Sequence, residues 1–230
     1  MPEPLRLPAL YAIVDPLDTG RAPEALAAAY LAGGARLLQL RVKDVTSREL
    51  LRAAERVAAL ARAAGAVFLV NDRPDVARAV DADGVHLGQD DLPVGAARRV
   101  LGPDRLVGVS THDLEEARAA VEAGADYIGV GPIYATASKA KALPARGPGL
   151  VAAVRGEVRC PIVAIGGITA ETAPAVLAAG ADAVAMIAAL ARAADPAAEV
   201  RRVIAALSGA PIPPRPPSRR PARPRGSRSA

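Results

Sequence analysis

Short apolar runs, rich in Val, Ile and Leu, alternate with Ala-rich segments along most of the chain. Each run spans four or five residues, the usual length of a strand that is buried on both faces. The segments between them carry apolar residues at helical spacing, as Leu50, Ala54, Val57 and Ala61 do. The alternation predicts eight strand–helix units, with strands at Leu10–Val14, Leu37–Arg41, Val67–Asn71, Gly84–Leu87, Leu106–Ser110, Tyr127–Val130, Ile162–Ile165 and Ala183–Met186.

The order of these units favours a closed barrel over an open sheet. A glycine ends the helix before several strands, as in Gly124-Ala125-Asp126 and Gly180-Ala181-Asp182. Alternating strands and helices imply parallel strands joined by right-handed crossovers. An open doubly wound sheet shows the same alternation, but Asp15-Pro16 follows the first strand, not a glycine-rich dinucleotide-binding turn. With eight units present, we predict an α/β fold consisting of one (β/α)8 TIM barrel.

Composition divides the chain into a barrel and a tail. Of the 230 residues, 51% are hydrophobic but only 2% aromatic, so the core must consist mainly of Ala, Val, Leu and Ile. We assign residues 1–209 to a single catalytic domain. Residues 210–230 contain seven Pro, six Arg and no acid, and they account for the net charge of +5. We expect this tail to be a disordered, solvated extension; contact with RNA or another acidic surface is the alternative.

Location and assembly are less constrained by the sequence. Cys160 is the single cysteine, so no intramolecular disulfide can form, which suits a reducing compartment. The N-terminal residues lack the pattern of a signal peptide, and no apolar stretch reaches the length of a membrane span. We therefore expect a cytoplasmic protein without membrane contact. A homo-oligomer is compatible with the sequence but is not predicted by it.

Polar residues follow several predicted strands, at the barrel end where active sites lie. Gln39, Arg41 and Lys43 alternate with apolar residues after the second strand, and such cations suit a diphosphate. Asp72 and Asp91 follow the third and fourth strands. Their carboxylates are either turn and helix-cap residues or ligands that share one Mg²⁺ ion with phosphate oxygens.

Two further segments suit a second anionic group. A long loop over residues 131–149 carries the donors Thr136, Ser138 and Lys139, and loops of this length inside a compact domain are usually functional. Gly166-Gly167 follows the seventh strand, where TIM barrels often bind a phosphate through backbone N–H groups.

As a set and in this order, several motifs closely resemble the thiamine phosphate synthase family. They are QLRVK (39–43), VND (70–72), GVHLGQDD (84–91), GVSTH (108–112), GPIYATASK (131–139) and AIGGIT (164–169). The resemblance covers residues 10 to 207. It implies a Mg²⁺-dependent transferase of thiamine biosynthesis that joins 4-amino-5-hydroxymethyl-2-methylpyrimidine diphosphate to a thiazole phosphate. Its small-molecule products are thiamine phosphate and pyrophosphate.

The resemblance also implies a role for individual residues. Gln39, Arg41, Lys43, Asn71, Ser110 and Lys139 would hold the pyrimidine diphosphate, and among them Arg41, Lys43, Ser110 and Lys139 would assist its cleavage. Asp72 and Asp91 would bind Mg²⁺. Thr136, Ser138, Gly167, Ile187 and Ala188 would form the thiazole phosphate site. One departure is Ala188, because the family commonly has Ser at this position.

The implied chemistry needs no protein nucleophile, because the thiazole nitrogen attacks with its own lone pair once pyrophosphate leaves. The enzyme must instead neutralise the charge on pyrophosphate and align the two rings. We therefore interpret His86 as a packing or hydrogen-bonding residue. His112, just beyond Ser110, keeps open a related thiazole tautomerase that works by acid–base chemistry. A non-catalytic, RNA-associated barrel is the other alternative.

Overall fold

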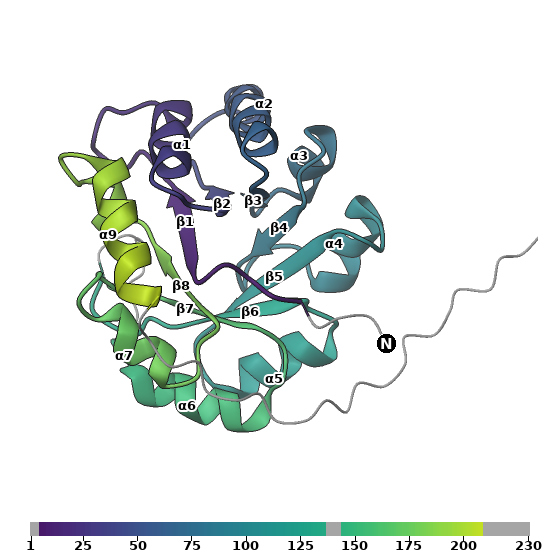
Figure 1. Ribbon diagram of the computed structural model, residues 1–230. Coiled ribbons are helices and arrows are strands. Elements are labelled where there is room, and N and C mark those ends of the chain that lie inside the picture. Colours follow the sequence, from purple (N-terminus) through teal and green to yellow (C-terminus); the bar gives the residue numbers. More distant parts are fainter. Residues whose placement is uncertain (1–4, 137–143, 209–230) are drawn as a thin grey trace, which may run out of the picture.

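The computed structural model describes residues 5–136 and 144–208, and these form a closed barrel (Figure 1). Eight strands pair in parallel and in chain order, and the last pairs with the first. The predicted (β/α)8 fold is therefore confirmed. The strands are β1 (Leu10–Val14), β2 (Leu37–Leu40), β3 (Val67–Asn71), β4 (Gly84–Leu87), β5 (Leu106–Thr111), β6 (Tyr127–Val130), β7 (Ile162–Ile165) and β8 (Ala183–Met186).

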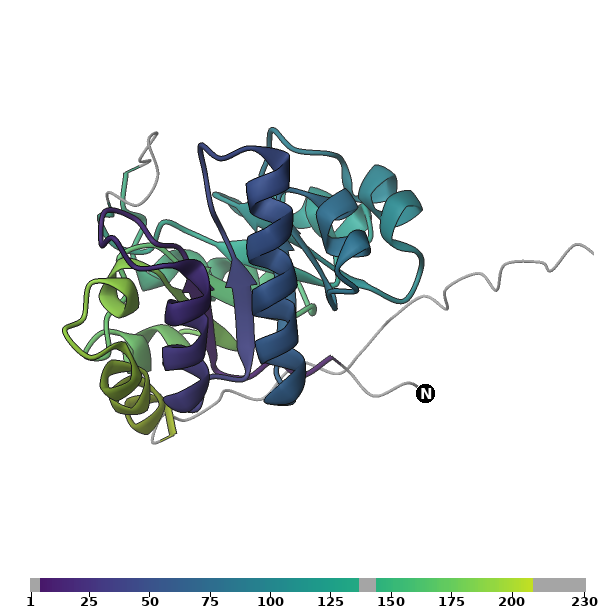
Figure 2. The ribbon, with the colours of Figure 1, turned by 90° about the horizontal axis from the view of Figure 1, so that it is seen from above.

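Helices surround the barrel, and the long helix α2 runs alongside β2 (Figure 2). A capping box starts α2, since Thr46 and Glu49 satisfy each other's backbone N–H groups. After β8 the chain forms two helices, and the second, α9, packs against α1. The helices are α1 (Pro23–Ala32), α2 (Ser47–Ala63), α3 (Pro74–Ala79), α4 (Val94–Leu101), α5 (Leu114–Glu122), α6 (Pro148–Glu157), α7 (Ala173–Ala178), α8 (Ala188–Ala191) and α9 (Pro196–Ser208).

Six of the predicted strands match in both bounds, and two differ at the end that faces the site. The second strand ends at Leu40 rather than Arg41, because its register with β1 and β3 stops at Leu40. The fifth continues to Thr111 because that residue pairs with Val130 of β6. Strand ends depend on these contacts between neighbouring strands, which hydrophobic periodicity does not report.

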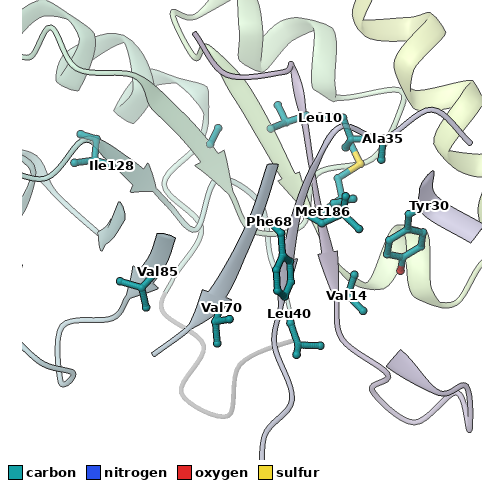
Figure 3. Packing of buried hydrophobic residues seen from close by; sticks show 14 of the residues in the cluster. Leu10, Val14, Tyr30, Ala35, Leu40, Phe68, Val70, Val85, Ile128 and Met186 are labelled. Carbon is teal, nitrogen blue, oxygen red and sulfur yellow. The ribbon is translucent and has the colours of Figure 1, made fainter. Parts of the chain in front are cut away.

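The strands separate two hydrophobic layers. On β1, Leu10, Ala12 and Val14 belong to the large cluster shared with the helices, while Tyr11 and Ile13 belong to a second cluster. Figure 3 shows part of the large cluster, including Phe68 and Met186. The second cluster combines residues of β1, β2, β3, β6, β7 and β8, as expected for the interior of a small barrel. This alternation leaves the interior positions near the strand ends available for polar side chains.

A repeated aspartate ties neighbouring strands together. Asp126, before β6, accepts a hydrogen bond from the backbone N–H of Val107 on β5 at 2.9 Å. Asp182, before β8, does the same for Ile162 on β7 at 2.8 Å. Both carboxylates also receive an arginine, from α4 and α6 respectively. These contacts join neighbouring strands at the end of the barrel that lies opposite the polar strand exits, the end that serves stability.

Parts of the predicted domain organisation concern residues that are not described. The basic tail at 210–230 and the loop residues Ser138 and Lys139 lie outside the described ranges. The predictions for them therefore stay predictions. Within the described ranges, none of the helices combines the length and the apolar character that crossing a bilayer requires.

Candidate functional site

A cavity of about 350 Å³ opens at the carboxyl ends of the strands. Its lining includes eight of the residues predicted to bind substrate: Gln39, Arg41, Asn71, Ser110, Thr136, Gly167, Ile187 and Ala188. It also includes four residues that were not predicted to bind substrate: Tyr11, His86, His112 and Arg192. Lys43, Asp72 and Asp91 are not part of this lining and form a separate cluster beside it.

Arg41 is held in the cavity wall by an ion pair. Its guanidinium contacts the carboxylate of Asp15, which follows β1, and both side chains are largely buried, at 13% and 8% exposed. A buried pair of this kind depends on each partner, because either charge alone would be left without compensation. The sequence analysis missed Asp15 as part of the site, although its place directly after the first strand was visible.

A chain of hydrogen bonds crosses the barrel interior beneath the cavity. Gln39 donates through Nε2 to the hydroxyl of Tyr11 at 2.7 Å, and the hydroxyls of Tyr11 and Tyr127 lie 3.0 Å apart. The Tyr127 hydroxyl lies 2.9 Å from Nδ1 of His86, and Nε2 of His86 lies 2.9 Å from Oγ of Ser110. Five strands thereby contribute one polar side chain each to a single buried network.

The two tyrosine hydroxyls of the network stay protonated. Burial raises the pKa of both Tyr11 and Tyr127, so each hydroxyl keeps its one proton. Each tyrosine therefore has one proton to donate within the network. One ring nitrogen of His86 contacts the Tyr127 hydroxyl and the other contacts the Ser110 hydroxyl, so His86 joins the tyrosine pair to the cavity wall.

This network agrees with the interpretation of His86 as a hydrogen-bonding residue and explains two other residues. Tyr11 and Tyr127 are buried as core residues are, yet their rings serve to carry hydroxyls to the barrel axis. Sequence periodicity placed both on strands but could not distinguish a polar network from hydrophobic packing. In a chain with only 2% aromatic residues, two tyrosines on barrel strands were the available signal.

Lys43, Asp72 and Asp91 form a cluster at the exits of β2, β3 and β4. The Lys43 ammonium contacts Asp72, and Oδ2 of Asp91 accepts the Gly88 backbone N–H at 2.7 Å. Asp72 has a positive φ of 65°, an unusual conformation outside glycine that often marks a functional position.

The two carboxyl groups of this cluster are hydrogen-bonded to each other, and their pKa values move in opposite directions. Burial favours a higher pKa for Asp72, but its contacts with Asp91 and Lys43 outweigh burial and lower it. Burial and the neighbouring Asp72 raise the pKa of Asp91. Within residues 5–136 and 144–208, no group of three His, Cys, Asp or Glu side chains is placed to hold a metal ion.

The glycine pair after β7 is required by the packing of the loop after β6. Gly167 has φ of +64°, and a side chain there would meet Cβ of Tyr134 at 2.8 Å and collide with the carbonyl oxygen of Ala135. The Tyr134 N–H donates to the carbonyl of Gly166 at 3.0 Å. These contacts fix Thr136 and Gly167 on the same side of the cavity.

Helix α8 completes this side of the cavity. Ile187 and Ala188 line the cavity at the start of the helix, and Arg192 lines it just past the end. Arg21, from the loop after β1, donates to the carbonyls of Ala191 at 2.6 Å and Ala193 at 2.9 Å. The helix is thereby tied to the first strand's loop, although it has only four residues.

His112 is oriented by the helix that follows it. Its Nδ1 lies 2.8 Å from Oε2 of Glu116, and the same oxygen accepts the His112 backbone N–H at 2.8 Å. Asp113 caps the helix by accepting from the Glu116 backbone N–H. The imidazole therefore borders the cavity in a fixed orientation, with its second nitrogen not used by Glu116.

Comparisons with known proteins identify the family of this chain. A model of the thiamine monophosphate synthase family matches residues 10–190. A thiamine-phosphate synthase of Moorella thermoacetica is 48% identical over 195 residues, covering 84% of this chain and 93% of its own. One of Anaeromyxobacter dehalogenans is 51% identical over 202 residues, covering 88% and 89%.

A solved structure agrees at the level of the fold. The thiamine phosphate pyrophosphorylase of Pyrococcus furiosus superposes with a TM-score of 0.80 at 34% identity, covering 86% of this chain and 95% of its own. The matched range contains all eight strands and every described residue of the cavity lining except Arg192, which lies two residues beyond it. The chain is a member of the thiamine monophosphate synthase family, a family of transferases.

Proposed function

We propose that the protein couples 4-amino-5-hydroxymethyl-2-methylpyrimidine diphosphate to a thiazole phosphate, releasing thiamine phosphate and pyrophosphate. The observation that carries this proposal is the division of the strand exits into two regions. One has the charged side chains that suit a diphosphate, and the other has the glycines and backbone groups that suit a phosphate monoester. The similarity to thiamine-phosphate synthases supports the same substrates.

The diphosphate lies, in this proposal, between Arg41 and the cluster of Lys43, Asp72 and Asp91. Arg41, directly after β2, and Asn71, the last residue of the adjacent strand β3, both line the cavity. Lys43 can exchange its contact with Asp72 for one with a phosphate, because half of its side chain is exposed. Lys139 remains a predicted member of this group, since it lies outside the described residues.

Asp72 and Asp91 fit a Mg²⁺ ion. Their carboxyl groups are near enough to share a hydrogen bond, so a cation bound between them can replace the proton of that bond. Two carboxylates with room for phosphate oxygens and water are the usual protein contribution to a Mg²⁺ site. The ion would neutralise charge on the departing pyrophosphate.

The pyrimidine ring lies over the buried network in this proposal. Gln39 and Ser110 are held by Tyr11 and His86, so their polar groups are fixed before the substrate arrives. Fixed donors orient the ring without further ordering and favour the geometry in which the methylene carbon faces the thiazole nitrogen. Proton removal by the protein is not required, which suits a His86 that is committed on both nitrogens.

Gly167, Thr136 and the backbone of Ile187 and Ala188 hold the thiazole phosphate in this proposal, and Ser138 is kept as a predicted contact. The absence of a side chain at Gly167 lets the loop after β6 pack against it, and Gly167 and Thr136 line the same cavity. Ala188 contributes only its backbone, and the hydroxyl that a Ser would add at this position is worth about 1 kcal/mol.

One observation favours a second candidate. His112 borders the cavity and is oriented by Glu116, an arrangement that also suits acid–base isomerisation of a thiazole. A thiazole tautomerase would act on the thiazole phosphate alone. Asp72, Asp91 and Lys43 would then have no role in the reaction.

The direct test mixes the full-length protein with both substrates, with each substrate omitted in turn, and with Mg²⁺ or EDTA. We expect thiamine phosphate and pyrophosphate in equal amounts, only when both substrates and Mg²⁺ are present. Turnover that survives EDTA would remove Mg²⁺ from the proposal. Isomerisation of the thiazole phosphate with no coupled product would replace the synthase with the tautomerase.

A further inference from the structure

Two guanidinium groups line the cavity on either side of β1. Arg41 follows β2 and Arg192 follows α8, and β1 pairs with both β2 and β8. The loop after β1 supplies one carboxylate to each arginine: Asp15 contacts Arg41, and Asp18 contacts Arg192 at 3.0 Å. Within the described lining these are the two side chains that are cationic at every physiological pH.

The two ion pairs differ in how firmly they hold their arginine. Arg41 and Asp15 are 13% and 8% exposed, whereas Arg192 and Asp18 are 55% and 74% exposed. An exposed pair adds little to stability because water and salt screen it. Both nitrogens of Arg192 that reach Asp18 contact the same oxygen, Oδ1, so the geometry is not the two-oxygen fork that makes such pairs strong. Arg192 is therefore free to exchange this partner for a better one.

Arg192 lines the cavity, so an anion bound in the cavity could be this better partner. Arg192 comes four residues after Ala188, so the two lie on the same side of α8. Ala188, Gly166, Gly167 and Thr169 border the same cavity, and none of them carries a charge. Among the described lining residues on this side of the cavity, a phosphate monoester would thus find backbone and hydroxyl donors together with one cationic side chain, Arg192.

We propose that Arg192 is a specificity-determining residue that binds the phosphate of the thiazole substrate by leaving Asp18. The inference rests on the proposed function for the identity of that substrate. A guanidinium forms two parallel hydrogen bonds with a phosphate, which the single Asp18 oxygen does not provide. Asp18 then serves as a competing anion that holds Arg192 at the rim of the cavity while no phosphate is bound.

Steady-state kinetics of the full-length protein test this role. Arg192→Ala should raise KM for the thiazole phosphate about 10- to 100-fold, the usual effect of losing a charge-assisted hydrogen bond, with kcat and KM for the pyrimidine diphosphate little changed. Arg192→Lys should recover part of the loss. The matched control is Arg56→Ala, which removes an equally exposed arginine paired with Glu24 on the outer helices.

Two further measurements keep the inference separate from the proposed function. Calorimetric titration with the thiazole phosphate should show weaker binding for Arg192→Ala than for Arg56→Ala, and the unphosphorylated thiazole alcohol should bind both variants equally. This result does not require turnover, so it stands even if the coupling reaction fails. Asp18→Asn should lower KM for the thiazole phosphate several-fold, because the competing anion is gone.

Equal thiazole phosphate affinity in Arg192→Ala and Arg56→Ala would overturn the proposal. A rise in KM with Asp18→Asn would also overturn it, because it would show that the ion pair, not the released guanidinium, supports the site. A matching loss of affinity for the thiazole alcohol in Arg192→Ala would assign Arg192 to ring packing or helix structure instead of the phosphate.

Discussion

The two sides of the cavity are built by different means. The side formed by β2 to β5 depends on polar side chains that are tied to each other inside the barrel, such as Arg41 with Asp15 and Ser110 with His86. The side formed by β7 and β8 depends on glycines, backbone and one exposed arginine. A buried network fixes its members before a ligand arrives. On the glycine-rich side, the absence of side chains instead lets the loop after β6 pack closely against the backbone. The first side should therefore be sensitive to the loss of a polar partner and the second to the addition of atoms.

The largest effect is expected from Arg41→Ala, on the side of the cavity formed by β2 to β5. The change removes a predicted diphosphate contact and leaves the Asp15 carboxylate buried without its partner. Breaking such a pair costs about 3–5 kcal/mol of unfolding free energy. Chemical denaturation measures the loss. The double variant Arg41→Ala/Asp15→Asn should recover part of the stability but not the affinity for the diphosphate, and recovery of both would refute the binding role.

Gly167→Ala tests the glycine side. The new methyl group would collide with the carbonyl of Ala135 and would force an L-residue to keep φ near +64°. We expect a loss of about 2–4 kcal/mol from strain and overpacking together. Gly65→Ala is the matched control, because Gly65 has φ of +61° with nothing within 4 Å of the added atom. That variant should lose only about 1 kcal/mol, the conformational part. Equal losses in thermal or chemical unfolding would show that packing against the loop after β6 is unimportant.

Tyr127→Phe should have a smaller effect, confined to the buried network that reaches Ser110. It removes the hydroxyl that lies between Tyr11 and His86, so two buried groups lose a partner. The expected cost is about 1–3 kcal/mol, together with a lower kcat, because His86, which contacts Ser110, loses the partner of its other ring nitrogen.

Tyr30→Phe is the control for Tyr127→Phe. Tyr30 is also fully buried, but its hydroxyl has no hydrogen-bond partner within the described part of the chain. Removing it should leave stability unchanged or slightly raised. A cost as large as that of Tyr127→Phe would mean that the network contributes no more than the packing of the ring.

The smallest effect is expected from Ala188→Ser, which adds a donor to the glycine side without disturbing its packing. A new hydroxyl near a phosphate is worth about 1 kcal/mol, so KM for the thiazole phosphate should fall by a few-fold. KM for the pyrimidine diphosphate should not change, and a change in both would contradict the separation of the two sides.

Sequence reasoning predicted the architecture well because a barrel's strands must be apolar on both faces and its helices must be periodic. It also predicted the residues that stand at strand exits, including Arg41, Ser110 and Gly167, because these are marked by their position in the chain. It missed Asp15, Tyr11, Tyr127 and Arg192 as site residues. Each of these acts through a partner 26 to 174 residues away, and that distance in sequence carries no local pattern.

The central claim is that the cavity binds two different anions at the same time, one on each side. Calorimetric titration tests it most directly: the protein is first saturated with pyrophosphate and Mg²⁺, and thiazole phosphate is then added. We expect thiazole phosphate still to bind with one site per chain. Arg41→Ala should weaken only the pyrophosphate step, and Arg192→Ala should weaken only the thiazole phosphate step. Competition between the two ligands for a single site would contradict it.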